Sequence, residues 1–197
     1  MKQKTKIKRR SAELSKRLLS SLAIGVGLIA CGVASMALLT GSQEVSQARE
    51  RALVVPARVD YPAPELTLAD LEGVSRSLKD YRGQVVLVNL WASWCPPCVA
   101  ELPTLNAFYG DYADQGFVLI GINAGESPSH VREYVLQRQL NFPIWIDTEQ
   151  RAGEAFRTMS LPSSFVIDRQ GRVRLEWLGA IERTMLDKYV VPLLREQ

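Results

Sequence analysis

The sequence has very few of the side chains that bind metal ions. It contains three cysteines and one histidine in 197 residues, whereas a structural zinc site takes four such ligands. One cysteine, Cys31, lies in a long apolar segment, which leaves Cys95, Cys98 and His130 for the folded part. A zinc site is therefore not expected. Covalent haem attachment is excluded as well, because it requires a histidine directly after the second cysteine of a pair, and Val99 occupies that position.

The net positive charge of the chain comes from its N-terminus. Residues 1–17 contain eight basic residues and one acidic residue, a net charge of +7, so the formal net charge of +3 leaves −4 for the rest of the chain. A domain of that charge has no basic surface of the kind that binds nucleic acid. With 47% apolar and 8% aromatic residues, the chain is also too apolar to be disordered throughout. The length suits one globular domain.

A long uncharged segment follows the basic tail. Residues 18–40 contain no charged side chain in 23 positions, which is the length that a helix needs to cross a bilayer. We interpret this segment as a transmembrane signal anchor, residues 1–17 as a cytoplasmic tail and residues 41–58 as a linker, since basic residues favour the cytoplasmic side. The domain at 59–197 is then expected on the extracytoplasmic face of the cell membrane. Residues 28–31 (LIAC) also resemble a lipoprotein processing box, and lipidation at Cys31 is the alternative.

The domain alternates strands and helices. Two almost wholly apolar runs, residues 84–90 (QVVLVNL) and 117–123 (FVLIGIN), are typical of strands buried on both faces. The helix predicted between them, at 96–113, makes this a parallel strand–helix–strand unit. Further strands are predicted at 65–69, 144–146, 164–168 and 172–178, a helical turn at 78–82, and helices at 127–139, 149–156 and 181–195. The pattern predicts an α/β sheet, parallel in the centre and antiparallel at one edge, covered by helices.

Two cysteines lie where the first buried strand meets its helix, in residues 94–98 (WCPPC). A helix N-terminus stabilises negative charge, so it favours the thiolate that attacks disulfides. We expect Cys95 to be the more exposed cysteine and the nucleophile, and Cys98, one turn into the helix, to be buried and to act second. Pro96 suits the first helical turn. An inert structural disulfide is the alternative to a redox-active pair.

The sequence resembles the ResA/TlpA family of membrane-anchored, thioredoxin-like thiol-disulfide oxidoreductases. The resemblance rests on residues 94–98 (WCPPC), 101–103 (ELP), 122–127 (INAGES) and 161–165 (LPSSF). It implies a thioredoxin-like fold with a central mixed sheet flanked by helices, an N-terminal β-hairpin extension and an insertion around residues 123–140. It also implies dithiol–disulfide exchange on protein disulfides without a metal or organic cofactor. The expected direction is reduction, with apocytochrome c as one substrate and a membrane thiol protein as electron donor.

The same resemblance assigns roles around the cysteines. Pro162 matches the family's cis proline, which places Leu161 beside Cys95, and Trp94 is expected to cover the pair as an apolar shield. We therefore expect substrate to bind along Trp94, Pro96 and Pro97 on one side and along Leu161 and Pro162 on the other.

Glu101 carries over as a third catalytic residue that exchanges protons with the thiols, because it follows Cys98 by three residues on the same helix face. Its alternative is an ordinary acid in a first helical turn. His130, by contrast, is expected to be solvated, and Trp145 and Trp177 to be packing residues.

Two other functions compete with this interpretation. A thiol peroxidase of the peroxiredoxin type would have a threonine three residues before its reactive cysteine, where this chain has Ala92. A tethered adaptor would use the sheet edge and the proline groove to bind partners without turnover. Substrate identity, reduction potential and oligomeric state do not follow from the sequence.

Overall fold

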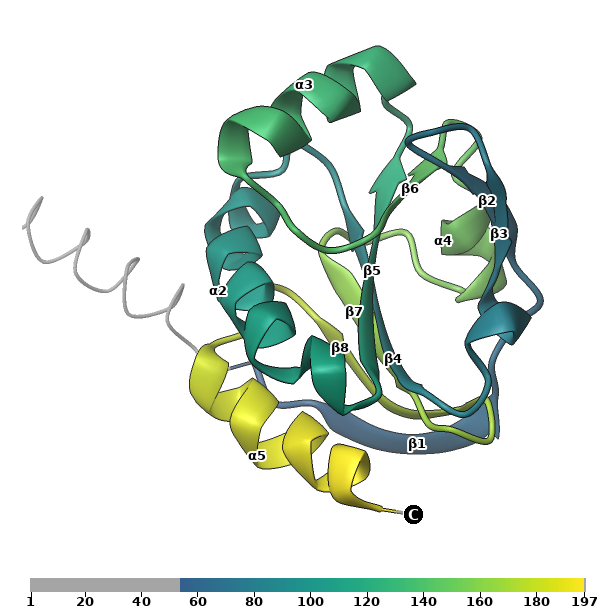
Figure 1. The fold of residues 1–197 in the computed structure, drawn as a ribbon, viewed down its shortest axis with the longest axis vertical. Coiled ribbons are helices and arrows are strands. Elements are labelled where there is room, and N and C mark those ends of the chain that lie inside the picture. The colour runs from purple at the N-terminus through teal and green to yellow at the C-terminus, as the bar shows by residue number, and fades with distance from the viewer. Residues whose placement is uncertain (1–53, 197) are drawn as a thin grey trace, which may run out of the picture. The chain divides into compact units, whose positions relative to one another are not determined.

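The structure is a computed structural model that describes residues 54–196. It contains one mixed sheet with helices on both faces (Figure 1). The strands are β1 (Ala57–Pro62), β2 (Thr67–Asp70), β3 (Ser75–Ser77), β4 (Val85–Trp91), β5 (Phe117–Ala124), β6 (Ile144–Asp147), β7 (Ser163–Ile167) and β8 (Arg172–Leu178). The helices are α2 (Pro96–Tyr112), α3 (Pro128–Arg138), α4 (Arg151–Ala155) and α5 (Arg183–Arg195), with 3₁₀ turns η1 (Leu78–Tyr81) and η2 (Ala113–Gln115). The predicted α/β class is confirmed.

The strand order is β1-β8-β7-β4-β5-β6-β2-β3. Only the β4–β5 and β5–β6 pairings are parallel, and every other pairing is antiparallel. The expectation of antiparallel strands at one edge only was wrong. Both edges are antiparallel, because the β2–β3 hairpin adds to β6 on one side while β7, β8 and β1 follow β4 on the other. The β2–β3 pair is the N-terminal hairpin that the resemblance implied.

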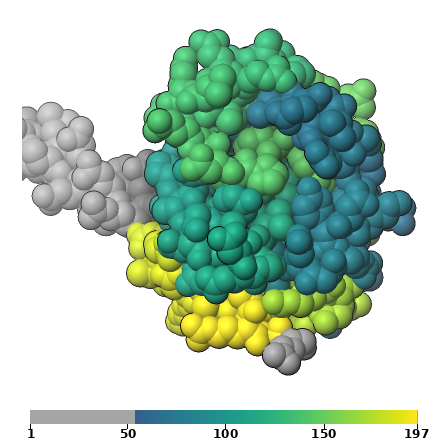
Figure 2. Space-filling model, viewed as in Figure 1, coloured from purple at the N-terminus to yellow at the C-terminus, as the bar shows by residue number. Residues whose placement is uncertain are grey.

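Strand β4 is buried along its whole length and separates two hydrophobic cores. Alternate side chains point to opposite faces of a strand, so Val85 and Leu87 contact one core while Val86 and Val88 contact the other. The first core lies under α2, α3 and α5, and the second lies under α4 and η1. In the space-filling view α5, in yellow, forms an outer layer of the molecule (Figure 2).

The ends of the helices follow local sequence signals. The side chain of Ser127 accepts a hydrogen bond from the His130 amide and Pro128 begins α3, as the predicted cap and first-turn proline require. After α2, Gly116 adopts a left-handed conformation with φ of 75°, which glycine reaches without a steric cost, and the chain turns into β5. The chain thus returns from α2 into β5, which pairs in parallel with β4.

The N-terminal boundary differs from the prediction. Strand β1 begins at Ala57, two residues before the domain boundary predicted at 59, and pairs with β8. Within residues 54–196 no helix is long and apolar enough to cross a membrane. The predicted tail, the predicted span with Cys31, and most of the predicted linker lie outside the described residues.

Candidate active site

Cys95 and Cys98 lie where β4 passes into α2. Cys95 is the N-cap of α2, Pro96 and Pro97 occupy its first turn, and the Cys98 amide donates a hydrogen bond of 3.4 Å to Cys95 Sγ. The missing amide hydrogens of the two prolines cost nothing there, because the first amides of a helix have no partner within it. The cysteines form a disulfide with an Sγ–Sγ distance of 2.08 Å. The helix start thus directs a main-chain donor at the sulfur of Cys95.

The two sulfurs differ in their access to solvent. Cys95 is 4% exposed and faces a groove, whereas Cys98 is fully buried beneath it. Cys95 is the more exposed of the two cysteines, as expected. It is nevertheless less exposed than its position at a helix start would suggest. An attacking thiolate can therefore reach Cys95 only through the groove.

The groove is an open cavity of about 460 Å³ whose lining contains no charged side chain. Its walls are formed mainly by Trp94, Pro96 and Pro97 on one side and by Met159 and Leu161 on the other. Trp94 is 68% exposed, so it is not a core packing residue. The peptide bond between Leu161 and Pro162 is cis, as the resemblance implied.

Glu101 lies on α2 three residues after Cys98 and is only 2% exposed. Its Oε1 accepts a hydrogen bond of 2.8 Å from Asn89 Nδ2, and its Oε2 accepts one of 3.0 Å from the Ile181 amide. Burial raises the pKa of Glu101 from 4.5 to about 7, although both hydrogen bonds oppose the shift. A carboxyl group with that pKa can gain or lose a proton near neutral pH.

Comparison with known proteins identifies the family to which this site belongs. The family model described as "AhpC/TSA family" matches residues 59–176. The chain belongs to the AhpC/TSA family. A protein named Thiol-disulfide oxidoreductase ResA from Bacillus thuringiensis subsp. konkukian is 32% identical over 163 residues, which cover 83% of this chain and 90% of that protein. One with the same name from Geobacillus thermodenitrificans is 39% identical over 128 residues, covering 65% of this chain and 74% of that protein.

Solved structures agree with these relatives. The crystal structure of a thiol:disulfide interchange protein of the thioredoxin family from Chlorobium tepidum matches with a TM-score of 0.63 at 28% identity, covering 70% of this chain and 99% of that chain. This AhpC/TSA protein is therefore a ResA-like, thioredoxin-fold thiol-disulfide oxidoreductase, and the cysteine pair itself is its redox centre. Within residues 54–196, no group of three or more His, Cys, Asp or Glu side chains is arranged to hold a metal ion.

Two polar residues near the site of this AhpC/TSA protein were not predicted. Asn89 holds Glu101 and also donates to Ser164 Oγ at 2.9 Å. Glu126 accepts hydrogen bonds from the main chain and the side chain of Ser93 at 2.7 and 2.5 Å. One signal could have revealed Asn89, because it is the single polar side chain inside the apolar run 85–91. Glu126 lies in the segment 122–127 (INAGES) on which the resemblance rested, but nothing in that segment indicated a contact with Ser93.

His130 is partly solvated, as expected, but it also has polar partners. Its Nε2 lies 2.9 Å from Ser93 Oγ and 3.3 Å from Glu126 Oε1. Trp145 and Trp177 are buried packing residues, which confirms their prediction.

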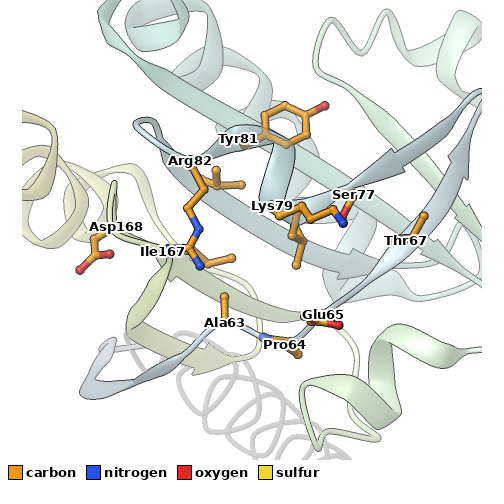
Figure 3. A pocket seen from close by; sticks show the side chains of 13 residues that line it. Ala63, Pro64, Glu65, Thr67, Ser77, Lys79, Tyr81, Arg82, Ile167 and Asp168 are labelled. Carbon is orange, nitrogen blue, oxygen red and sulfur yellow. The ribbon is translucent and has the colours of Figure 1, made fainter.

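A separate cavity of about 120 Å³ lies at the opposite end of β4 (Figure 3). It lies between η1, with Lys79 and Tyr81, and the stretch around Pro64, and Arg82 extends into it. None of the predicted site residues lines it. The redox site and this cavity are therefore distinct features of the domain.

Proposed function

We propose that this oxidoreductase is a membrane-tethered reductant of protein disulfides on the extracytoplasmic side. The observation that carries the proposal is the Cys95–Cys98 disulfide at the start of α2, with Cys95 facing an uncharged groove and Cys98 buried behind it. This arrangement presents one sulfur to a partner and keeps the second within reach for a following step.

The proposed reaction has two exchange steps. The Cys95 thiolate attacks a substrate disulfide, forming a mixed disulfide and releasing one substrate sulfur as a thiolate. The Cys98 thiolate then attacks Cys95 Sγ, which releases the second substrate thiolate and leaves the Cys95–Cys98 disulfide. Two electrons pass to the substrate in all, and a dithiol donor in the membrane returns them to the cysteine pair.

Glu101 is proposed as the proton carrier of these steps. Each thiol must lose a proton before it attacks, and each released substrate thiolate takes one up. A buried carboxyl group whose pKa lies at about 7 suits both directions of transfer at neutral pH. Its position one helical turn beyond Cys98 supports this role.

The groove is proposed to bind the chain around the substrate disulfide. Its apolar walls, formed by Trp94, Pro96, Pro97 and Leu161, suit an extended segment without charges next to its cysteine. Pro162 fixes the direction of the chain at Leu161. Apocytochrome c is the substrate that we propose first, because its paired cysteines must be reduced before haem is attached.

A trapping experiment tests this function. With the full-length chain, Cys98→Ser should accumulate a mixed disulfide through Cys95, since the second step is blocked, whereas Cys95→Ser should trap nothing. Mass spectrometry of the trapped species then identifies the substrate. An empty trap together with rapid consumption of peroxide by the wild type would favour the peroxidase, and partner binding that is unchanged in Cys95→Ser would favour the adaptor.

A second experiment tests the location. A membrane-impermeant maleimide added to intact cells should modify Cys95 of the reduced protein, and the protein should remain with the membrane fraction after a salt wash. A cysteine that is labelled only after lysis would contradict the proposed orientation.

A further inference from the structure

A polar cluster connects the loop before Cys95 to the beginning of α3. Its centre is the Glu126 carboxylate, which is about one-tenth exposed. Oε2 accepts hydrogen bonds from the Ser93 amide at 2.7 Å and from Asn123 Nδ2 at 2.6 Å, and Oε1 accepts one from Ser93 Oγ at 2.5 Å. Two of the three donors thus belong to the residue that lies two positions before Cys95.

The proton on each donor can be assigned by elimination. Ser93 has one hydroxyl proton, and it points to Glu126. His130 Nε2 lies 2.9 Å from the same hydroxyl oxygen and 3.3 Å from the carboxylate, so it must carry a proton itself to bind either oxygen. Burial alone would raise the pKa of Glu126, but the hydrogen bonds from Ser93 and Asn123 outweigh it and keep that pKa below its usual value. The cluster is therefore a carboxylate surrounded by donors.

The loop that the cluster holds, residues 92–94 between β4 and α2, makes few other hydrogen bonds. Ser93 is partly exposed and Trp94 is mostly exposed, so neither residue is fixed by core packing. The main chain contributes one short-range contact, a hydrogen bond of 3.2 Å from the Cys95 amide to the Ala92 carbonyl. Glu126, which lies 33 residues further along the chain than Ser93, supplies two of the three long-range hydrogen bonds to Ser93, and His130 supplies the third.

We propose that Glu126 is a positioning residue for the exchange reaction, acting through Ser93 to fix the loop that places Trp94 and Cys95 at the groove. The role rests on the proposed exchange at Cys95, but it adds a residue from the β5–α3 connection to the machinery. A shift of about 1 Å in a reacting atom is enough to slow a reaction by orders of magnitude. Loss of the Glu126 side chain therefore slows exchange even when the fold is intact.

Glutamine is a conservative replacement for this role. In Glu126→Gln, the amide oxygen can accept from the Ser93 amide and from Asn123, while the amide nitrogen can donate to Ser93 Oγ. The Ser93 hydroxyl proton is then free for His130 Nε2, which accepts it in the other tautomer. The glutamine variant keeps the attachment and loses only the charge, whereas Glu126→Ala loses both.

The test compares the full-length wild type with Glu126→Ala, Glu126→Gln and the control Glu133→Ala, in mild detergent. Glu133 lies on the neighbouring helix α3, and its side chain accepts a hydrogen bond from the exposed Gln137 but makes no contact with Ser93 among the described residues. The rate of reduction of a peptide disulfide, with kcat and KM determined separately, is the first measurement. The second is acrylamide quenching of tryptophan fluorescence, which reports on Trp94 because the other three tryptophans are buried.

We expect Glu126→Ala to lose about tenfold or more in kcat/KM and to become more readily quenched, while Glu126→Gln stays within about threefold of the wild type. The control should match the wild type in both measurements. Equal losses in the alanine and glutamine variants would overturn positioning in favour of an effect of charge, and an unimpaired alanine variant would overturn the role altogether. A wild type that exchanges no disulfide would contradict the proposed function instead.

Discussion

Replacing Glu101 by glutamine should remove a pH dependence from the stability of this domain. The folded protein keeps the Glu101 proton up to a pH of about 7, while the unfolded chain releases it near 4.5. Between these values the folded state binds more protons, so a rising pH favours unfolding. The stabilisation from the protonated carboxyl is thus fully present below pH 4.5 and is lost as the pH rises to about 7.

The magnitude follows from the same two values. Each pKa unit corresponds to about 1.4 kcal/mol, so the interval from 4.5 to about 7 amounts to about 3 kcal/mol in the free energy of unfolding. Because Glu101 is almost fully buried, solvent screening should not reduce this figure greatly. The glutamine of Glu101→Gln cannot titrate. The free energy of unfolding of this variant therefore lacks the pH-dependent change that Glu101 causes.

A glutamine at this position can keep a partner for each of its own amide atoms, and any cost of rearranging Asn89 is the same at every pH. Its amide oxygen can accept from the Ile181 amide, as Glu101 Oε2 does now. Its amide nitrogen would face Asn89, whose Oδ1 has no hydrogen-bond partner among the described residues. A rotation of the Asn89 amide by half a turn brings that oxygen toward the new donor, and Ser164 Oγ can then donate to it as well. The pH dependence of the stability difference between the wild type and Glu101→Gln therefore reports on the titration of Glu101 and not on a change in packing.

The assay is urea unfolding of residues 54–197, with the cysteine pair oxidised, at several pH values between 4 and 8.5. The quantity of interest is the wild-type free energy of unfolding minus that of Glu101→Gln, in which the contributions of all other titrating groups cancel. We expect this difference to fall by about 3 kcal/mol as the pH rises from 4.5 to 8. A difference that does not change with pH would show that Glu101 titrates at its ordinary value, and the argument for it as a proton carrier would fail.

Three further substitutions test the fold around the site. Gly121→Ala places a Cβ 2.7 Å from a ring carbon of Phe142, so it should cost about 1–3 kcal/mol in the free energy of unfolding. Gly110→Ala, in α2 with open space around it, should instead gain up to about 1 kcal/mol, and a loss would contradict the helix described there. Asp147→Ala removes the carboxylate that accepts from the first two amides of α4, and thermal unfolding should show a loss of about 1–2 kcal/mol. An unchanged midpoint for Asp147→Ala would mean that solvent replaces this cap.

The central part of the fold could be predicted because its signals are local. The runs around β4 and β5 are apolar on both faces, and the cap at Ser127 is a single residue with its proline. Strand β1 was missed for the opposite reason. Most of its side chains are partly or fully exposed, as at Asp60, and it is defined by hydrogen bonds to β8, more than a hundred residues further along the chain. No local pattern contains such a pairing.

The site, too, has residues that the local sequence predicts and residues that only the tertiary structure reveals. Cys95, Cys98 and Glu101 occur within seven residues, and one strand-to-helix junction explains their placement. The partners that tune them come from elsewhere, since Asn89 lies on the strand before and Glu126 on a loop beyond the next strand. Residue type and spacing could identify the reactive groups, but only tertiary structure shows what holds them.

The hydrogen bond between Glu101 and the Ile181 amide spans 80 residues and ends close to the C-terminus. During synthesis, the two cysteines therefore emerge well before the segment that completes the carboxyl's surroundings. A nascent chain carries two thiols without that buried acid, and the tuned centre is assembled only when the last helix docks. If Glu101 carries protons as proposed, an unfinished chain should exchange disulfides more slowly than the complete domain.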